Sequence, residues 1–142
     1  MKKTFSETFP SGTVKTSVTS ITLVNNTQKV QDVSVPSDTV WVIQCIRAVN
    51  IDDVQRTVVI DLWNEAAKTS KIARLQSGAV AAVTDLVYPS ITAGGTIIGV
   101  PTAVLVLGPG MTISVTWAAG GVSTGATDSD GLVILYRELT LT

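Results

Sequence analysis

The stretch Leu107-Gly108-Pro109-Gly110-Met111-Thr112-Ile113-Ser114-Val115-Thr116-Trp117 decides the fold class of this chain. A Gly-Pro-Gly turn leads into a segment in which apolar and hydroxyl residues alternate strictly, the period-two pattern of a β-strand with two different faces. The apolar positions, which we expect to fill the core, are Met111, Ile113, Val115 and Trp117. The hydroxyl positions, which we expect to face solvent or a neighbouring subunit, are Thr112, Ser114 and Thr116. The segment therefore predicts an antiparallel sheet with one buried face.

Further strand signals occur on both sides of this segment. Each is a run rich in β-branched residues and bounded by turn residues. The run at 39–49 is apolar on both faces, which is typical of a central strand that is covered on both sides. The expected strands are 16–24, with a bulge near Thr19-Ser20, and then 39–49, 56–63, 71–75, 96–107 and 132–137.

Irregular connections are expected between these strands. The segment 64–77 fits either a single helical turn at 65–68 or a loop followed by a strand, and we favour the loop and strand. Residues 78–95 and 118–131 are rich in small residues and are expected to be long connections. No segment keeps a helical period. The sequence predicts an all-β, single-domain antiparallel β-sandwich, jelly-roll-like, at residues 14–142, with an extended N-terminal arm at residues 1–13.

The composition excludes several kinds of catalytic site. The 142 residues include no histidine, which is the commonest general base and a favoured metal ligand. A Ser-His-Asp or Cys-His arrangement is therefore excluded. Cys45 is the single cysteine, so no intrachain disulfide can form, and its apolar surroundings in the sequence indicate a buried structural residue.

The charge distribution argues against two classes of partner. Ten basic and eleven acidic residues give a formal net charge of −1 and are scattered along the chain. Because nucleic-acid binders present a basic stripe or patch, we expect no nucleic-acid partner. The most apolar run, 97–107, is too short to span a bilayer, so we expect no membrane insertion. Lys2-Lys3 is not followed by an apolar segment, and we expect no secretory signal.

Two groups of carboxylates lie close together in the sequence, Asp52-Asp53 and Asp128-Ser129-Asp130. Both lie in expected turns, where aspartate commonly accepts hydrogen bonds from nearby backbone amides. The second group is similar to the opening of a calcium loop, but Leu139 stands where the bidentate glutamate is required. We therefore expect no catalytic residue, no metal site and no cofactor.

Four short motifs follow one another between residues 35 and 115. They are Val-Pro-Ser-Asp-Thr-Val-Trp-Val at 35–42, Val-Asn-Ile-Asp at 49–52, Arg-Thr-Val-Val-Ile at 56–60 and Leu-Gly-Pro-Gly-Met-Thr-Ile at 107–113. Together they resemble a small jelly-roll family of virion structural proteins in tailed bacteriophages. Met111 departs from the family pattern, which often has an aspartate at that position.

This resemblance implies a non-enzymatic building block of a virus particle. The favoured role is a capsid decoration (cement) protein, often a homotrimer, and a neck or tail component is the alternative within the same class. The implied location is the capsid surface of the virion, assembled in the host cytoplasm. The implied partners are the major capsid protein or other virion proteins, together with further copies of this chain.

Several residues are candidates for subunit contact. Charged residues make up 15% of the chain against a typical quarter, and uncharged hydroxyl faces lose less than charged ones on desolvation. Docking of the arm on its own domain, ordinary partial burial of the tryptophan and simple solvation of the hydroxyl face all remain open as alternatives. The candidates are Phe5 and Phe9 in the arm, Trp63 on the more polar face of its strand, and Thr112, Ser114 and Thr116.

Two other classes of function also remain open. A carbohydrate-binding β-sandwich would stack a sugar on an exposed aromatic ring, for which Trp41, Trp63 and Trp117 are the candidates. A small hydrolase would have to work with carboxylates alone, and its candidates are Asp52, Asp53, Asp128 and Asp130.

Overall fold

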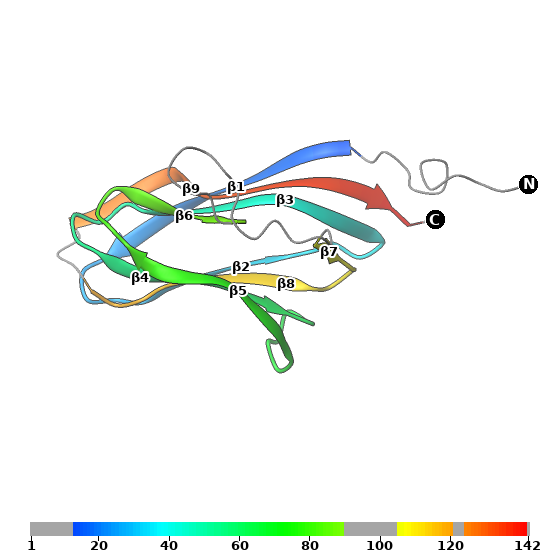
Figure 1. The fold of residues 1–142 in the computed structure, drawn as a ribbon, viewed down its shortest axis with the longest axis horizontal. Helices are drawn as coiled ribbons and strands as arrows, with labels where there is room; N and C mark the ends of the chain where they lie inside the picture. Colours follow the sequence, from blue (N-terminus) through cyan, green and yellow to red (C-terminus); the bar gives the residue numbers. More distant parts are fainter. Residues whose placement is uncertain (1–12, 90–104, 121–123, 142) are drawn as a thin grey trace, which may run out of the picture.

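The chain forms two antiparallel β-sheets packed face to face, which confirms the expected all-β sandwich (Figure 1). The computed structural model describes residues 13–89, 105–120 and 124–141. Sheet A contains, in spatial order, β1 (Thr13–Val24), β9 (Thr124–Thr140), β3 (Thr39–Asn50) and β6 (Thr84–Tyr88), and β7 (Val106–Leu107) also pairs with β3. Sheet B contains β2 (Lys29–Ser34), β8 (Thr112–Trp117), β4 (Arg56–Trp63) and β5 (Lys71–Val80).

The strand pairs are nested along the sequence. If the short β7 is left aside, β1 pairs with the last strand, β9, and each further pair, β2–β8, β3–β6 and β4–β5, lies within the stretch of sequence enclosed by the pair before it. Two four-stranded sheets made by such an arrangement form a jelly roll, in which partners far apart in sequence lie side by side. The strand order therefore agrees with the expected jelly-roll architecture.

The core lies between the two sheets and is made by alternate residues of their strands. Trp117 is completely buried, and its indole N–H donates to the backbone carbonyl of Val49 at 2.8 Å, which joins sheet B to sheet A. Burial of these aliphatic side chains supplies the main stabilising term, at about 25 cal/mol for each Å² of apolar surface removed from water. The fully buried aliphatic residues include Ile21, Leu23, Ile46, Val58, Ile60, Leu107, Ile113, Val115, Leu132 and Ile134.

Several predicted elements are confirmed and others are wrong. β4 has the expected bounds, and β3 extends one residue beyond its predicted end. The loop expected at 118–131 is wrong, because β9 begins at Thr124. The connection expected at 78–95 is wrong in part, because β5 continues to Val80 and β6 occupies Thr84–Tyr88. β2 was not predicted. The part of the expected strand at 96–107 that precedes residue 105 lies outside the described residues.

The bulge predicted near Thr19-Ser20 occurs at that point of the β1–β9 pair, but its extra residues belong to β9. Thr19 pairs with Leu132 whereas Ile21 pairs with Asp128, so β1 itself keeps a regular alternation. Gly131 lies in the bulged segment, and a Cβ at this position would be 2.6 Å from the Cβ of Ile21. Glycine is therefore required here for the close approach of the two strands.

Candidate contact surfaces

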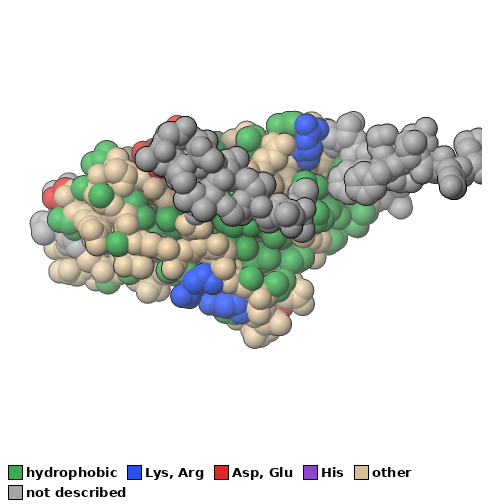
Figure 2. Space-filling model, in the orientation of Figure 1, with side chains coloured by type: hydrophobic (Ala, Val, Ile, Leu, Met, Phe, Trp, Pro, Cys, Tyr) green, Lys and Arg blue, Asp and Glu red, His purple; other side chains and the backbone are tan. Residues whose placement is uncertain are grey.

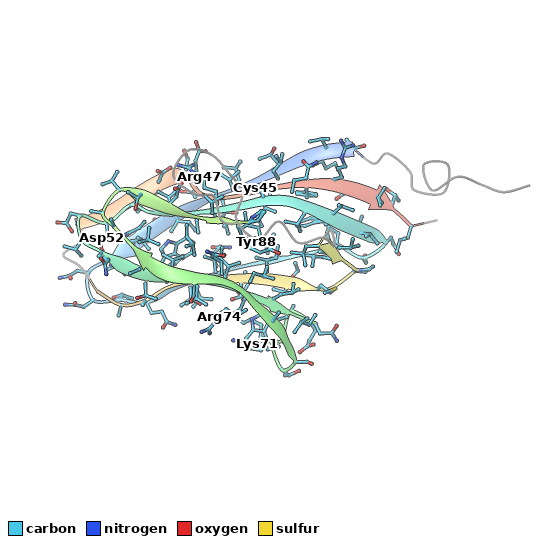
Figure 3. All side chains as sticks on the ribbon, viewed as in Figure 1. Cys45, Arg47, Asp52, Lys71, Arg74 and Tyr88 are labelled. Carbon is cyan, nitrogen blue, oxygen red and sulfur yellow. The ribbon has the colours of Figure 1, made fainter. Side chains whose placement is uncertain are left out.

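A buried cluster of polar side chains joins the strands at one end of the sandwich. The Arg56 side chain is fully buried, and its Nε donates to Oδ2 of Asp52 at 2.5 Å. The guanidinium also donates to the backbone carbonyls of Val24, Thr27 and Ala118 at 2.9 to 3.0 Å. Figure 3 places Asp52 at this end, away from both outer faces.

Asn50 extends the same cluster. Its amide group donates to the backbone carbonyls of Val54 and Val80 at 2.9 Å, and its side-chain oxygen accepts from the backbone N–H of Asp52. Burial alone would raise the pKa of the Asp52 carboxyl, but the hydrogen bonds from Arg56 and Asp53 hold that pKa below its ordinary value. The Asp52 carboxylate therefore stabilises the fold as one half of an ion pair.

The other carboxylate group, around Asp128, also has a local structural role. The Asp128 carboxylate accepts a hydrogen bond of 2.7 Å from the backbone N–H of Asp130, as expected of aspartate in a turn or bulge. Among residues 13–89, 105–120 and 124–141, no group of three His, Cys, Asp or Glu side chains has the arrangement of a metal site. The same part of the chain contains no helix of the length and hydropathy needed to cross a bilayer.

The residues that carry the family resemblance lie at both ends of the sandwich. At one end the motif at 49–52 and Arg56 form the buried polar cluster. At the other end the motifs at 35–42 and 107–113 meet, because the N–H of Val35 donates to the carbonyl of Met111 and the N–H of Gly110 donates to the carbonyl of Val35, both at 2.9 Å. These motifs therefore have structural roles at the two ends of the sandwich.

The outer face of sheet B carries paired charges. Asp61 accepts hydrogen bonds from Lys71 at 2.9 Å and from Arg74 at 3.0 Å, and in Figure 2 Lys and Arg side chains gather beside β5. Burial would raise the pKa of Asp61, but the bonds from Arg74 and Lys71 lower it. Lys68 reaches from the β4–β5 loop to Asp32 on β2 at 3.0 Å. The carboxylates on this face are thus engaged within the chain.

Trp63 lies on this face at the end of β4 and is partly exposed. The ammonium group of Lys71 lies 4.9 Å from the centroid of its ring, within the range of a cation–π contact. The indole nitrogen is buried and has no hydrogen-bond partner among the described residues. One side of the ring is therefore occupied by a side chain of the same molecule.

The expectation that Thr112 and Ser114 face solvent or a neighbour is wrong. β8 lies between β2 and β4, so side chains of both neighbouring strands flank these two positions, Ser34 and Trp63 beside Thr112 and two aspartates beside Ser114. Thr112 is completely buried and its hydroxyl lies 2.8 Å from that of Ser34, while Ser114 is only 4% exposed. Thr116 alone of the three hydroxyl positions is partly exposed. In the apolar set, Ile113, Val115 and Trp117 fill the core as expected, and Met111 is partly exposed.

The outer face of sheet A carries an apolar patch on β1, β9 and β3, which is flanked by the Arg47–Asp85 ion pair and by Arg137. Val18 on β1 is 51% exposed and pairs with Val133 on β9, which is partly exposed as well. The next outward row contains Leu135 of β9 and Cys45 of β3, both partly exposed. Figure 3 shows Cys45 on the side of the sandwich opposite Lys71 and Arg74. Sequence reasoning missed this surface, because the strand at residues 132–137 was assigned no outward face.

Cys45 differs from its expected position in the core. It is partly exposed on the outer face of sheet A, and burial raises the pKa of its thiol, with the charge of Asp85 acting in the same direction. A raised pKa keeps the thiol protonated and poorly nucleophilic near neutral pH. Cys45 is therefore one more weakly polar side chain on this surface.

Two of the three tryptophans are unavailable for stacking on a ligand. Trp117 is completely buried and Trp41 is 4% exposed. The Trp41 ring stacks on Tyr136 with centroids 3.9 Å apart, and its N–H donates to Glu138 at 3.0 Å. Phe5 and Phe9, the contact candidates in the arm, lie outside the described residues.

Comparisons of the chain with protein-family models, with curated proteins and with solved structures find no match.

Proposed function

We propose that this chain is a non-enzymatic structural protein of a virus particle, and that it decorates the capsid of a tailed bacteriophage. The observation that carries the proposal is the apolar patch of β1, β9 and β3 on the outer face of sheet A, in a sandwich with a jelly-roll strand order. The sequence motifs at 35–42 and 107–113 add the resemblance to virion proteins of this fold. The role suggested by that resemblance is to bind the shell of the particle and stabilise it.

The asymmetry between the two outer faces supports a surface-binding role. Sheet B presents hydroxyl groups and charges that are paired within the chain, which suits a face in contact with water. Sheet A also carries one paired charge, Arg47 with Asp85, but its strands β1 and β9 present Val18, Val133 and Leu135, whose contact with water is unfavourable. A contiguous apolar surface on a small domain commonly marks a protein–protein contact. Sheet A is therefore the face that we assign to the capsid.

Reconstitution on capsids tests this assignment. Purified chain is added to capsids assembled without it, and the particles are imaged by cryo-electron microscopy. We expect regular added density for the wild type, and loss of that density for Leu135→Lys, because a charge at this position must be desolvated in the contact. Val30→Lys is the matched control, since it places the same charge at an exposed valine on the outer face of sheet B.

Other outcomes would contradict either the capsid role or the assignment of the contact to sheet A. Capsids that stay bare in the presence of the wild-type chain would contradict decoration. Added density at the neck or tail would show that the chain binds that part of the virion instead. Decoration that persists in Leu135→Lys and fails in Val30→Lys would assign the contact to sheet B instead.

A glycan-binding assay tests the competing carbohydrate-binding role. Trp63 is the only tryptophan with a partly exposed ring, and Lys71 occupies one side of it. We therefore expect no glycan binding by the wild-type chain. Binding that disappears in Trp63→Ala would contradict our proposal and favour the carbohydrate-binding class.

A further inference from the structure

Among the described residues, β1 is an outermost strand of sheet A and pairs with β9 alone. We propose that this edge binds the same edge of a second copy of the chain in antiparallel orientation, so that sheet A continues across a two-fold axis. The inference concerns the isolated chain and does not rest on its proposed role in a virus particle. It assigns to β1 a partner that none of the residues described above supplies.

The other three edges of the sandwich have features that discourage pairing with a further strand. β6 is five residues long and carries Asp85, and β2 is six residues long and carries Lys29 and Asp32. β5 carries Lys71 and Arg74, and its pairing with β4 has two register shifts. Short strands, charges and bulges are the usual means by which proteins protect a sheet edge.

β1 lacks these protective features over most of its length. It is twelve residues long, contains no proline and has a regular alternation, because the extra residues of the β1–β9 pair lie in β9. Its single charge, Lys15, is the third of its twelve residues, so the nine residues that follow it are all uncharged. A long and regular edge with an uncharged stretch of this length is a template for another strand.

The outward side of β1 is suited to contact with a copy of itself. The side chains on this side are all uncharged: Val14, Thr16, Val18, Ser20, Thr22 and Val24. A two-fold axis brings equivalent groups together, so an unpaired charge near the axis would repel its own copy. Val14, Val18 and Val24 are 50 to 52% exposed in the single chain, so there is apolar surface for a contact to bury.

The pairing register follows from the position of these valines. Residues opposite each other in an antiparallel pair point to the same side of the sheet, so the two-fold axis must pass beside one residue of β1. With Val18 on the axis, it faces the second copy's Val18, and Thr16 faces the second copy's Ser20. Because Val133 is the neighbour of Val18 on β9, four valines then form one continuous row across the two copies.

Charge substitutions at Val18 test both the partner and the register. Sedimentation velocity is measured for the wild-type chain, for Val18→Lys, for Val18→Glu and for an equal mixture of the two variants. We expect twice the monomer mass for the wild type and a monomer for each variant, because like charges then meet at the axis. The mixture is expected to regain the doubled mass, since Lys and Glu would face each other.

Val30→Lys is the matched control, because Val30 is an exposed valine on an edge strand of sheet B. It should keep the doubled mass of the wild type. Far-ultraviolet circular dichroism and thermal unfolding of each variant establish that it folds.

Three results would overturn the proposal. They are a monomeric wild type, a wild-type oligomer of any size that Val18→Lys leaves intact, and a mixture of the two folded variants that stays monomeric. The homotrimer implied by the family resemblance would be one form of the second result. Since these measurements involve no capsids, loss of the dimer and loss of capsid decoration are separate outcomes.

Discussion

Asp52 and Arg56 form a fully buried ion pair. The Arg56 Nε and the Asp52 Oδ2 are 2.5 Å apart, and neither side chain is exposed to solvent. Three further N–H groups of the guanidinium donate to backbone carbonyls, two around the β1–β2 connection and one in the residue after β8. One side chain on β4 thereby satisfies polar groups from three separate segments. Such a pair holds its position because every charged atom has a partner.

Replacement of Arg56 should strongly destabilise the fold. Arg56→Ala leaves the Asp52 carboxylate buried without its partner, and we expect a loss of about 3–5 kcal/mol in the free energy of unfolding. Arg74→Ala is the matched control, because Arg74 binds Asp61 at a site where its own side chain is 54% exposed. We expect the control to lose much less, because an ion pair with an exposed partner contributes little to stability. Equal losses in urea-induced unfolding would show that burial of the Asp52–Arg56 pair is unimportant.

Stability should fall in acid. The pKa values of Asp52, Asp61 and Glu138 are lowered in the folded chain, so the unfolded chain binds more protons in acid. The contribution of these groups is fully present above the unfolded carboxyl pKa of about 4 and is lost as the pH drops through the folded values.

Asp61→Asn provides the test of this pH dependence. We expect the urea midpoint of the variant to depend less on pH than that of the wild type below the ordinary carboxyl range, because one depressed pKa has been removed. An unchanged pH dependence would mean that the Asp61 carboxyl titrates alike in the folded and unfolded chain.

Gly131→Ala should destabilise sheet A. The new methyl group would overlap the Ile21 side chain, which is completely buried and has no space to move into. We expect a loss of about 1–3 kcal/mol, as for other overpacked cores. Gly108→Ala is the control, because the nearest atom to its Cβ would be the Met111 sulfur at 3.9 Å. A smaller loss in Gly131→Ala than in Gly108→Ala, measured by thermal unfolding, would contradict this account.

Val83→Asn should stabilise the chain. Val83 lies in the turn between β5 and β6 with a φ of 54°, a left-handed conformation that is unfavourable for a β-branched residue, and its side chain is 76% exposed. Asparagine tolerates this conformation, so we expect a gain of about 1 kcal/mol. Val106→Asn, at an exposed position in β7, should give no gain. A loss of stability in Val83→Asn would show that the backbone strain has been overestimated.

The strands that could be predicted from the sequence are those with a strong apolar pattern of their own. β4 and β3 are rich in β-branched residues, and their bounds follow from that pattern. The first part of β9, from Thr124, consists of small and polar residues and is a strand because β1 and β9 pair there. Such an element depends on a distant partner, so no local pattern could reveal it.

The candidate contact residues were predicted less well, for a related reason. The alternation in β8 correctly separates two faces, but burial of the hydroxyl face depends on the neighbouring strands β2 and β4. The apolar patch on the outer face of sheet A combines residues from β1, β9 and β3, which are far apart in sequence. The run from Val133 to Leu135 in β9, apolar on both faces, is the one signal that could have indicated it.

The place of β9 in sheet A sets the order in which the sandwich can be completed during synthesis. β1 and β3 emerge early from the ribosome, yet they never touch as neighbours, because β9 lies between them. Until residues 124–140 have been made, two long strands have unpaired edges that must be kept from pairing with each other or with other chains. The strand of this sandwich that comes last in the sequence thus joins β1 and β3, and until it inserts, the edges that it covers in the folded sheet are open to pairing with other strands.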